Sequence, residues 1–153
     1  MSSATTELSE PFRTLWQRKD PFQAVEELEG EVFRELEARR TLRTAVAGRG
    51  YFVKIHRGIG CAEIIKNLVC MRLPVLGASN EWFAIKRLEK LGVSTMKGVA
   101  FGKRGTNPAT QHSFIVTEEL TPTISLEDYC RDWPKQPPLP ALKRALIRRV
   151  ADM

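Results

Sequence analysis

The order of strand-like and helix-like segments is the feature that most constrains how this chain can fold. Five segments have the β-branched and aromatic composition of strands and are bounded by turn residues. These segments run from Glu31 to Arg40, Thr41 to Val46, Tyr51 to His56, Thr95 to Phe101 and Ser113 to Glu119. Two helical segments, from Cys61 to Arg72 and from Ser79 to Leu91, separate the third strand from the fourth. This grouping predicts an α+β domain in which a five-stranded antiparallel sheet carries its helices on one side.

The third predicted strand presents different residues on its two faces. Side chains alternate along a strand, so Val53 and Ile55 share one face while Phe52 and Lys54 share the other. Lys54 is therefore a charged residue with apolar strand neighbours. We expect a hairpin turn at Gly48-Arg49-Gly50, between this strand and the one before it.

The N-terminal region contains a clear helix start. Asp20 is a good N-cap, Pro21 suits the first helical position and Gly30 follows the end, which predicts a helix from Asp20 to Glu29. A short amphipathic stretch precedes this helix; its apolar members are Phe12, Leu15 and Trp16. The stretch could lie on a membrane surface or fold back on the domain. We favour folding back, because so short a segment buries little apolar area in a bilayer.

The last third of the chain is expected to begin a further structural unit. A short helix starts at Ser125, a proline-rich loop follows, and a final helix starts near Leu139. One face of the final helix is apolar, with Leu142, Leu146, Val150 and Met153. No later element remains to cover this face, so we expect the chain to be the first part of a longer protein. The predicted organisation is a helical extension (1–30), a main unit (31–120) and the start of a second unit (121–153).

Composition and charge limit the kinds of partner and site. The chain has 153 residues and a formal charge of +6, which attracts nucleotides, phosphorylated lipids, nucleic acid or acidic proteins. No apolar run approaches the roughly 20 residues of a membrane-spanning helix, and the N-terminus is polar, so we expect a cytoplasmic protein. The three cysteines and two histidines have no metal-ligand spacing, which predicts reduced thiols, structural histidines and no metal site.

Two residues near the centre of the chain suit phosphoryl transfer. This reaction needs a cation fixed against the nucleotide phosphates, and a strand lysine held by a helix carboxylate supplies one. Lys54 and Glu81 are the candidates for that pair, about 27 positions apart. Glu63 follows the strand too closely to be the better partner. On pattern alone, such a lysine is more often an ordinary residue at a strand edge.

Two further regions could contribute to a nucleotide site. The strand that ends at Glu118-Glu119-Leu120 runs into an extended linker, whose backbone groups could read the edge of an adenine ring or simply be solvated. The glycine-rich phosphate loops of known nucleotide-binding motifs are absent. Instead, the turn between the first two strands carries Arg39, Arg40 and Arg43, which could bind phosphate or face solvent.

Longer runs of sequence resemble one known family. They are Tyr-Phe-Val-Lys-Ile-His-Arg-Gly (51–58), Glu-Ile-Ile-Lys-Asn-Leu (63–68), Arg-Leu-Pro-Val-Leu-Gly (72–77), Gly-Val-Ala-Phe-Gly (98–102) and Glu-Glu-Leu-Thr-Pro-Thr-Ile-Ser-Leu-Glu-Asp-Tyr-Cys (118–130). These runs look like the lipopolysaccharide core heptose(I) kinases, which are protein-kinase-like. The resemblance implies a kinase N-terminal lobe over 31–120, then a linker and the start of a C-terminal lobe. It also implies ATP-dependent phosphorylation of the first heptose of the lipopolysaccharide inner core of Gram-negative bacteria.

The resemblance assigns roles to individual residues. Lys54 would contact the nucleotide phosphates, and Glu81 would orient it. Thr117 would stand at the back of the adenine pocket, with Glu118 and Leu120 offering linker backbone to the ring. Arg39 and Arg40, with Arg43, would be substitutes for the missing glycine loop.

The resemblance also implies what lies outside this chain. The family's catalytic loop, with its aspartate base, and its metal-binding aspartate would follow the last helix, so the Mg²⁺ ligands are expected beyond Met153. Phosphoryl transfer depends on positioning and charge stabilisation, so we expect the 153-residue chain alone to be inactive. The implied acceptor is the lipopolysaccharide core or a lipid A precursor, made at the inner face of the inner membrane.

The alternative is a non-catalytic basic module that binds an anionic membrane surface or an acidic protein. Such a module would bind with steep salt dependence and would ignore ATP. Nucleic acid is the least suitable partner, because exposed aromatic residues are not interleaved with the basic ones and Tyr51 and Phe52 are expected in the strand core.

Overall fold

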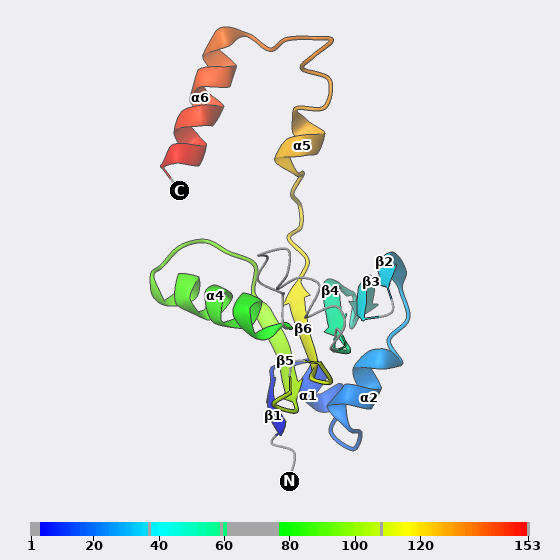
Figure 1. The fold of residues 1–153 in the computed structure, drawn as a ribbon. Coiled ribbons are helices and arrows are strands. Elements are labelled where there is room, and N and C mark those ends of the chain that lie inside the picture. The colour runs from blue at the N-terminus through cyan, green and yellow to red at the C-terminus, as the bar shows by residue number, and fades with distance from the viewer. Residues whose placement is uncertain (1–3, 37, 59, 61–76, 108, 153) are drawn as a thin grey trace.

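The computed structural model describes residues 4–36, 38–58, 60, 77–107 and 109–152 (Figure 1). The elements run in the order β1 (Ala4–Leu8), α1 (Phe12–Leu15), α2 (Pro21–Glu26), β2 (Glu31–Leu36), β3 (Arg39–Val46), β4 (Arg49–His56), α4 (Ser79–Lys90), β5 (Gly98–Arg104), β6 (His112–Glu118), α5 (Leu126–Tyr129) and α6 (Pro140–Ala151). The strands form one antiparallel sheet in the order β1-β5-β6-β4-β3-β2. The expected helix from Cys61 to Arg72, with Glu63, lies outside the described residues.

The sheet has six strands, so the expected number of five was wrong. The additional strand is β1, which pairs with β5 from Ala4↔Arg104 to Leu8↔Ala100. Four of its five residues are exposed. An edge strand of this kind buries no alternating apolar face, and that alternation is the signal by which a strand is found in a sequence.

The tight turn between β3 and β4 lies slightly earlier than expected. Val46 pairs directly with Arg49, which leaves Ala47 and Gly48 as a two-residue loop. Their φ angles are 51° and 76°, and positive φ at both central residues is the conformation that hairpin twist favours. The expected turn at Gly48-Arg49-Gly50 was therefore wrong in position, because β4 begins at Arg49.

The three arginines expected in a turn belong to a strand. β2 ends at Leu36 and β3 begins at Arg39, with these two residues paired across the strands. Arg40 and Arg43 follow within β3. Charged residues suggested a turn, but β3 lies near the edge of the sheet, where one face of a strand tolerates charge.

Helices cover both faces of the sheet, so the expectation that they lie on one side was wrong. Leu42, Val53, Ile55, Phe114 and Val116 pack with residues of α1 and α2; we call this the α2 face. Phe101 and Ile115 pack with α4 on the opposite face, which we call the α4 face. The cause is the N-terminal amphipathic stretch, which adds a second helical layer.

The N-terminal stretch folds back on the domain, as expected. Phe12 is fully buried and Trp16 is 3% exposed. The Phe12 ring meets the ring of Tyr51 edge-on, with centroids 5.0 Å apart. α2 then begins as predicted, because the Asp20 side chain accepts a hydrogen bond from the Phe22 N–H and Pro21 occupies the first turn.

The α4 helix begins at Ser79, as predicted, and ends one residue before the predicted Leu91. Ala78 is the N-cap residue and Ser79 is the first helical residue, so Ser79 does not cap the helix. At the other end Gly92 has a φ of 72°, and the Val93 N–H donates to the Leu88 carbonyl at 3.0 Å. This pairing satisfies carbonyls that the helix end leaves free.

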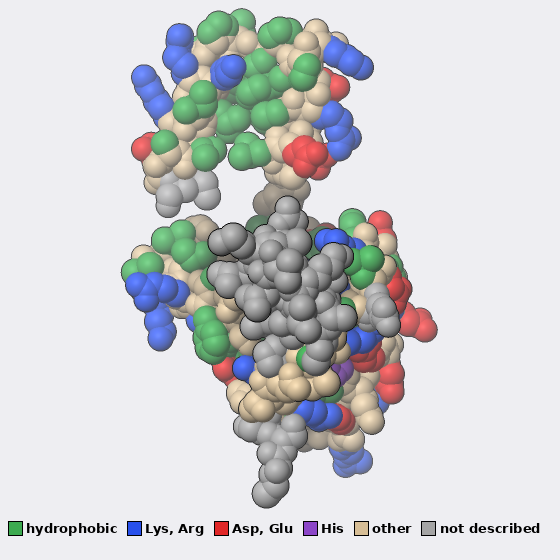
Figure 2. Space-filling model, viewed as in Figure 1, with side chains coloured by type: hydrophobic (Ala, Val, Ile, Leu, Met, Phe, Trp, Pro, Cys, Tyr) green, Lys and Arg blue, Asp and Glu red, His purple; other side chains and the backbone are tan. Residues whose placement is uncertain are grey.

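The segment after β6 leads away from the sheet and ends in α5 and α6 (Figure 1). α5 follows Ser125, where a short helix was predicted to begin, and the Ser125 hydroxyl caps it by accepting from the Asp128 N–H. No residue of α6 is buried, and hydrophobic side chains gather between α5 and α6 while basic ones lie at the outer edges (Figure 2). Within the described residues, no helix is both long and apolar enough to span a bilayer.

Candidate nucleotide site

Lys54 and Glu81 form an ion pair between β4 and α4. The Lys54 Nζ atom lies 2.6 Å from Glu81 Oε1, and the two side chains are 39% and 31% exposed. A charge-assisted hydrogen bond of this length holds both groups in one orientation. The expected contact is thus formed, and its role in catalysis stays a prediction.

The packing of α4 explains why Glu81 reaches the sheet. Trp82 and Ile85 are buried against Phe101 and Ile115, and the rings of Trp82 and Phe101 stack 5.3 Å apart. Ile115 is also the cross-strand partner of Lys54. The apolar contact that anchors the first turn of α4 therefore brings the carboxylate beside the lysine.

A cavity of about 420 Å³ opens beside Lys54 and the segment that leaves β6. We call it the linker cavity; its lining residues are Phe52, Lys54, Met96, Thr117, Glu118, Glu119, Leu120 and Thr123. Lys54, Thr117, Glu118 and Leu120 were predicted from the sequence as site residues, and the structure brings all of them to this cavity. Thr117 is 4% exposed and pairs with Phe52 across the strands, so these two side chains share the α4 face.

The linker after β6 has a backbone donor at Leu120 that is not used by the described residues. The Glu118 N–H donates to the Lys97 carbonyl and the Glu119 N–H to the Gly50 carbonyl, each at 2.9 Å. Within the described part of the chain, the Leu120 N–H donates no hydrogen bond. A free donor at the wall of a cavity suits a ligand with an acceptor on its edge, such as a purine base.

The linker is fixed to β3 by a bidentate ion pair. Arg43 donates from Nε to Glu119 Oε1 at 2.7 Å and from Nη2 to Oε2 at 2.9 Å. The hydrogen bonds from Arg43 hold the pKa of the Glu119 carboxyl below its usual value. A Cβ at Gly50 would lie 1.8 Å from Glu119 Oε2, so any larger residue there would displace this carboxylate from its present position. Arg43, considered above as a phosphate ligand, is therefore engaged with the linker.

A second cavity, of about 410 Å³, also includes Lys54. We call it the basic cavity; its lining residues are Arg34, Arg39, Arg40, Thr41, Lys54, Ile55, His56, Gly77, Asn80 and Glu81. Four of these residues are arginine or lysine and one is a carboxylate. The cavity therefore presents a positive surface on which an anionic group would be favoured.

Arg39 and Arg40 take different directions in this region. Arg39 pairs with His56 across the strands, whereas Arg40 pairs with the buried Ile55. The Arg40 Nη1 atom donates to the Glu26 carbonyl of α2 at 2.9 Å, and its side chain is 17% exposed. Of the two predicted phosphate ligands, Arg39 therefore lies on the same face as Lys54, while the guanidinium of Arg40 is held by α2.

His56 lies in the basic cavity as a neutral group. Burial is the main cause that lowers the pKa of His56 below its usual value, and Arg39 and Lys54 lower it further while Glu81 opposes them. Its Nδ1 atom is buried and has no hydrogen-bond partner within the described residues. At neutral pH this imidazole therefore adds no charge to that of the arginines and lysine.

The two cavities together have the chemistry that an adenine nucleotide requires. The linker cavity offers apolar walls from Phe52 and Met96 and a free backbone donor, which suits a flat base. Lys54 stands where the two cavities meet, and the basic cavity beyond it suits phosphates. The described residues contain no cluster of three or more His, Cys, Asp or Glu able to hold a metal ion, so nothing here assigns a place to Mg²⁺.

Sequence reasoning missed several cavity residues, among them Met96 and Arg34, and misjudged Phe52. Met96 and Arg34 line the cavities but carry no motif that would identify them. Phe52 was expected in the strand core, yet it lies on the α4 face and lines the linker cavity. Alternation was the available signal for Phe52, because it places this ring on the same face as Lys54.

Comparisons with known proteins agree with this geometry. Residues 23–153 match the lipopolysaccharide kinase (Kdo/WaaP) family. The lipopolysaccharide core heptose(I) kinase WaaP of Pseudomonas aeruginosa is 64% identical over 146 residues, and the match covers 95% of this chain and 54% of that relative. The protein of the same name from Escherichia coli (strain K12) is 60% identical over 147 residues, covering 96% of this chain and 56% of the relative.

A solved structure also resembles the chain. It is WaaP in complex with acyl carrier protein, with a TM-score of 0.77, 56% sequence identity, and coverage of 96% of this chain and 54% of that one. The chain thus spans about half the length of the curated relatives it matches. By the extent of the family match and these identities, the chain belongs to the lipopolysaccharide kinase (Kdo/WaaP) family.

Proposed function

We propose that this chain supplies the ATP-binding lobe of a kinase that phosphorylates the first heptose of the lipopolysaccharide inner core. The observation that carries the proposal is the place of Lys54, where a linker cavity suited to a base meets a basic cavity suited to phosphates. Relatives that are 60–64% identical carry the name lipopolysaccharide core heptose(I) kinase, which supports this acceptor. When bound, ATP supplies the phosphoryl group that is transferred to a heptose hydroxyl.

In this proposal five of the predicted residues have distinct tasks. Leu120 donates its backbone N–H to the base, and Thr117 closes the back of the linker cavity. Lys54 donates from Nζ to phosphate oxygens, and Glu81 keeps Nζ from swinging into solvent. Arg39 adds positive charge in the basic cavity. These groups bind and orient the nucleotide, and binding of this kind is a large part of phosphoryl-transfer catalysis.

The 153-residue chain alone is proposed to lack kinase activity. Within the described residues, the cavities contain no aspartate that could accept the proton of an acceptor hydroxyl and no group of carboxylates for a metal ion. Phosphoryl transfer needs these groups in place together with a bound nucleotide. Mg²⁺ is expected to be held by residues that this chain does not provide.

We further propose a location and partners for the protein. A lipid-linked acceptor would place it in the cytoplasm, at times in contact with the inner face of the inner membrane. The formal charge of +6 favours anionic surfaces and acidic proteins. Acyl carrier protein is the partner in the solved relative and is therefore the first protein partner to test.

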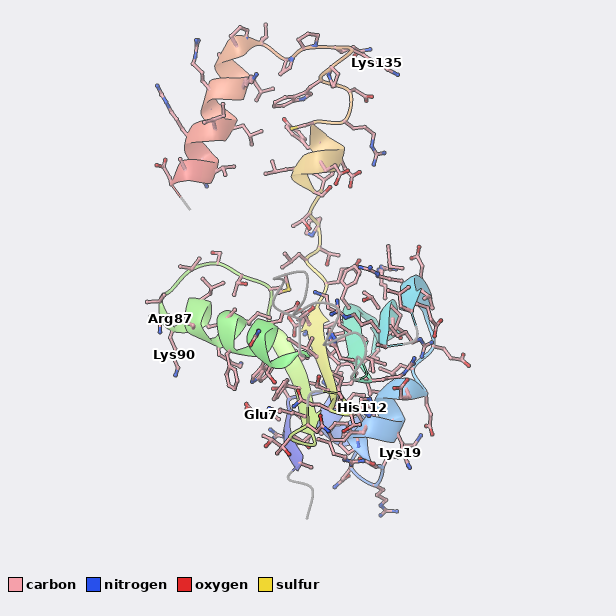
Figure 3. The ribbon with its side chains drawn as sticks, in the orientation of Figure 1. Glu7, Lys19, Arg87, Lys90, His112 and Lys135 are labelled. Carbon is pink, nitrogen blue, oxygen red and sulfur yellow. The ribbon has the colours of Figure 1, made fainter. Side chains whose placement is uncertain are left out.

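The proposed activity can be tested with the protein as its gene encodes it. The protein is incubated with ATP, Mg²⁺ and lipopolysaccharide core that lacks heptose phosphate, and mass spectrometry measures phosphate on the first heptose. We expect phosphorylation by the natural protein, its loss in Lys54→Ala, and full retention in Lys90→Ala, whose side chain projects away from the sheet (Figure 3). Phosphorylation of another sugar, or full activity of Lys54→Ala, would contradict the proposal. If the 153-residue chain alone phosphorylated the heptose, the proposal that it supplies only the ATP-binding lobe would be wrong.

A further inference from the structure

An irregularity in β2 places two consecutive side chains against one residue of β3. The pairing runs Val32↔Leu42 and then Arg34↔Thr41, so Phe33 is an extra residue in β2. Phe33 and Arg34 both stand opposite Thr41. This arrangement is a β-bulge, which re-aims side chains and occurs more often than average beside active sites.

The bulge changes which face Arg34 occupies. In a regular strand, consecutive residues point to opposite faces, so Arg34 would have shared the α2 face with Val32 and Arg40. With the bulge, Arg34 pairs with Thr41, whose next cross-strand neighbour is Lys54. Arg34 accordingly lines the basic cavity together with Lys54.

Phe33 is an exposed ring beside the linker cavity. Its side chain is 58% exposed, and its ring centroid lies 5.8 Å from that of Phe52, which lines the cavity. An aromatic side chain left this exposed at the edge of a cavity offers area for a flat ligand to cover. Phe33 thus extends the aromatic wall that Phe52 begins.

Arg34 is a cation that its surroundings leave available. Its side chain makes no ion pair within the described residues, whereas Arg40 and Arg43 on the neighbouring strand are held by Glu26 and Glu119. A guanidinium group that lines an open cavity can present two parallel donors to a phosphate. The structure therefore leaves Arg34 free for the contact that Arg43 cannot make.

We infer that the bulge takes the place of the absent glycine-rich loop, with Phe33 covering the base of a bound adenine nucleotide and Arg34 contacting its phosphates. The inference rests on the proposed nucleotide-binding function and adds two binding residues to it. Both residues come from one irregularity of the strand: Arg34 lines the basic cavity, and Phe33 contacts Phe52, which lines the linker cavity. A glycine loop contacts phosphate through backbone N–H groups, whereas this strand would use a side-chain cation and an aromatic ring.

The test compares nucleotide ligands on variants of the protein as its gene encodes it. Calorimetric titration measures the Kd of adenosine and of ATP for the natural protein, Phe33→Ala, Arg34→Ala and the control Val32→Ala. Val32 is 42% exposed in the same strand and pairs outside the bulge, so its variant reports on general effects in β2. Far-ultraviolet circular dichroism and melting temperature check that each variant is folded.

The inference predicts a distinct pattern across the ligands. Phe33→Ala should weaken adenosine and ATP by a similar factor, roughly tenfold, because base stacking is lost for both. Arg34→Ala should weaken ATP by roughly tenfold or more and leave adenosine unchanged. Val32→Ala should match the natural protein for both ligands.

Two outcomes would overturn the inference in different ways. If the natural protein binds ATP and Lys54→Ala weakens that binding, while Phe33→Ala and Arg34→Ala behave like Val32→Ala, the bulge has no part in binding and the nucleotide site stands. If the natural protein binds neither ATP nor adenosine, the proposed function fails, and the inference fails with it.

Discussion

The two faces of the sheet are completed in different ways. On the α2 face, Phe12, Trp16 and Phe22 fill the space under α1 and α2, and none is more than 3% exposed. On the α4 face, Trp82 and its neighbours cover the sheet where β5 and β6 lie, but the cavities around Lys54 remain open. One face is a closed apolar core and the other is a partly covered surface with charged cavities.

This difference separates the source of stability from the source of binding. Burial of apolar surface is the main favourable contribution to folding, so the α2 face should carry most of the stability that side chains provide. The side chains around Lys54 keep part of their hydration and pair with one another, so they contribute little to folding. Substitutions on the α2 face should therefore lower the free energy of unfolding, whereas substitutions around Lys54 should lower the affinity for nucleotide.

The largest effect is expected from a cavity made on the α2 face. Phe12→Ala removes a fully buried ring that contacts Trp16 and Tyr51, and should lower the free energy of unfolding by about 3–5 kcal/mol. Urea denaturation followed by tryptophan fluorescence measures the change. As a matched control, Phe83→Ala removes a ring that is 63% exposed and should cost no more than about 1 kcal/mol. Equal losses in the two variants would show that the faces do not differ as described.

The next largest effect concerns binding on the α4 face. Lys54→Ala should raise the Kd for ATP by roughly tenfold to a hundredfold, because a charge-assisted contact to phosphate is lost. Its free energy of unfolding should change by less than about 1 kcal/mol, since the lysine is 39% exposed. Lys86→Ala is the control. Lys86 is 37% exposed and pairs with Glu89 at 3.1 Å. This variant therefore also loses an ion pair, but one that lies away from both cavities. A loss of ATP affinity in Lys86→Ala as large as that in Lys54→Ala would remove the special role of Lys54.

A smaller effect is expected for the ion pair that ties α2 to the sheet. Glu26 accepts from Arg57 Nε at 2.9 Å and from Nη2 at 2.7 Å, and this hydrogen bonding is the main cause that lowers the pKa of Glu26 below its usual value of 4.5. A lowered folded-state pKa means that ionised Glu26 stabilises the fold above about pH 4.5, and that this contribution is lost as the pH falls through the lower value. Glu26→Gln should therefore cost about 1 kcal/mol at pH 7 and little at pH 3.

The acid dependence of stability checks this prediction. Urea denaturation of the natural protein and of Glu26→Gln between pH 7 and pH 3 should show a difference that shrinks on acidification. His112 lies 3.3 Å from Glu26 beside α2, and burial is the main cause that lowers the pKa of its imidazole below the usual value (Figure 3). Glu27→Gln is the control, because the Glu27–Lys19 pair is about 60% exposed and should contribute almost nothing at any pH. A constant difference between Glu26→Gln and the natural protein from pH 7 to pH 3 would contradict the assignment.

The smallest effect is expected at the clamp between β3 and the linker. Arg43→Ala frees Glu119 and lets the segment with Leu120 move, so the Kd for ATP should rise by about twofold to fivefold. Arg49→Ala, in the adjoining hairpin, is the control, because Arg49 has no ion pair within the described residues. Unchanged ATP affinity in Arg43→Ala would mean that the clamp does not position the linker.

Much of the α2 face and of the linker cavity could be predicted from local sequence signals. Asp20 was identified as an N-cap, because its side-chain oxygen can accept a hydrogen bond from a free N–H in the first turn of the helix. Alternation along β4 placed Lys54 on the opposite face from Val53, and that assignment depends only on the period of a strand. The family resemblance then supplied Thr117, Glu118 and Leu120, which the structure brings to one cavity.

The features that could not be predicted depend on how strands pair with one another. β1 has no buried alternation, so only its pairing with β5 makes it a strand. The bulge at Phe33 is defined by the register between β2 and β3, and a single extra residue changes the face of Arg34. The direction of Arg40 follows from the pairing of β3 with β4. Arg40 was assigned to a turn, because the second strand was expected to begin at Thr41.

The account is tested most directly by a crystal structure of the protein with a non-hydrolysable ATP analogue. We expect the base in the linker cavity, within about 3 Å of the Leu120 N–H, and phosphate oxygens within about 3 Å of the Lys54 Nζ atom. The α2 face should remain closed and unchanged. A nucleotide bound elsewhere, or with its phosphates directed away from Lys54 and the basic cavity, would contradict the central claim.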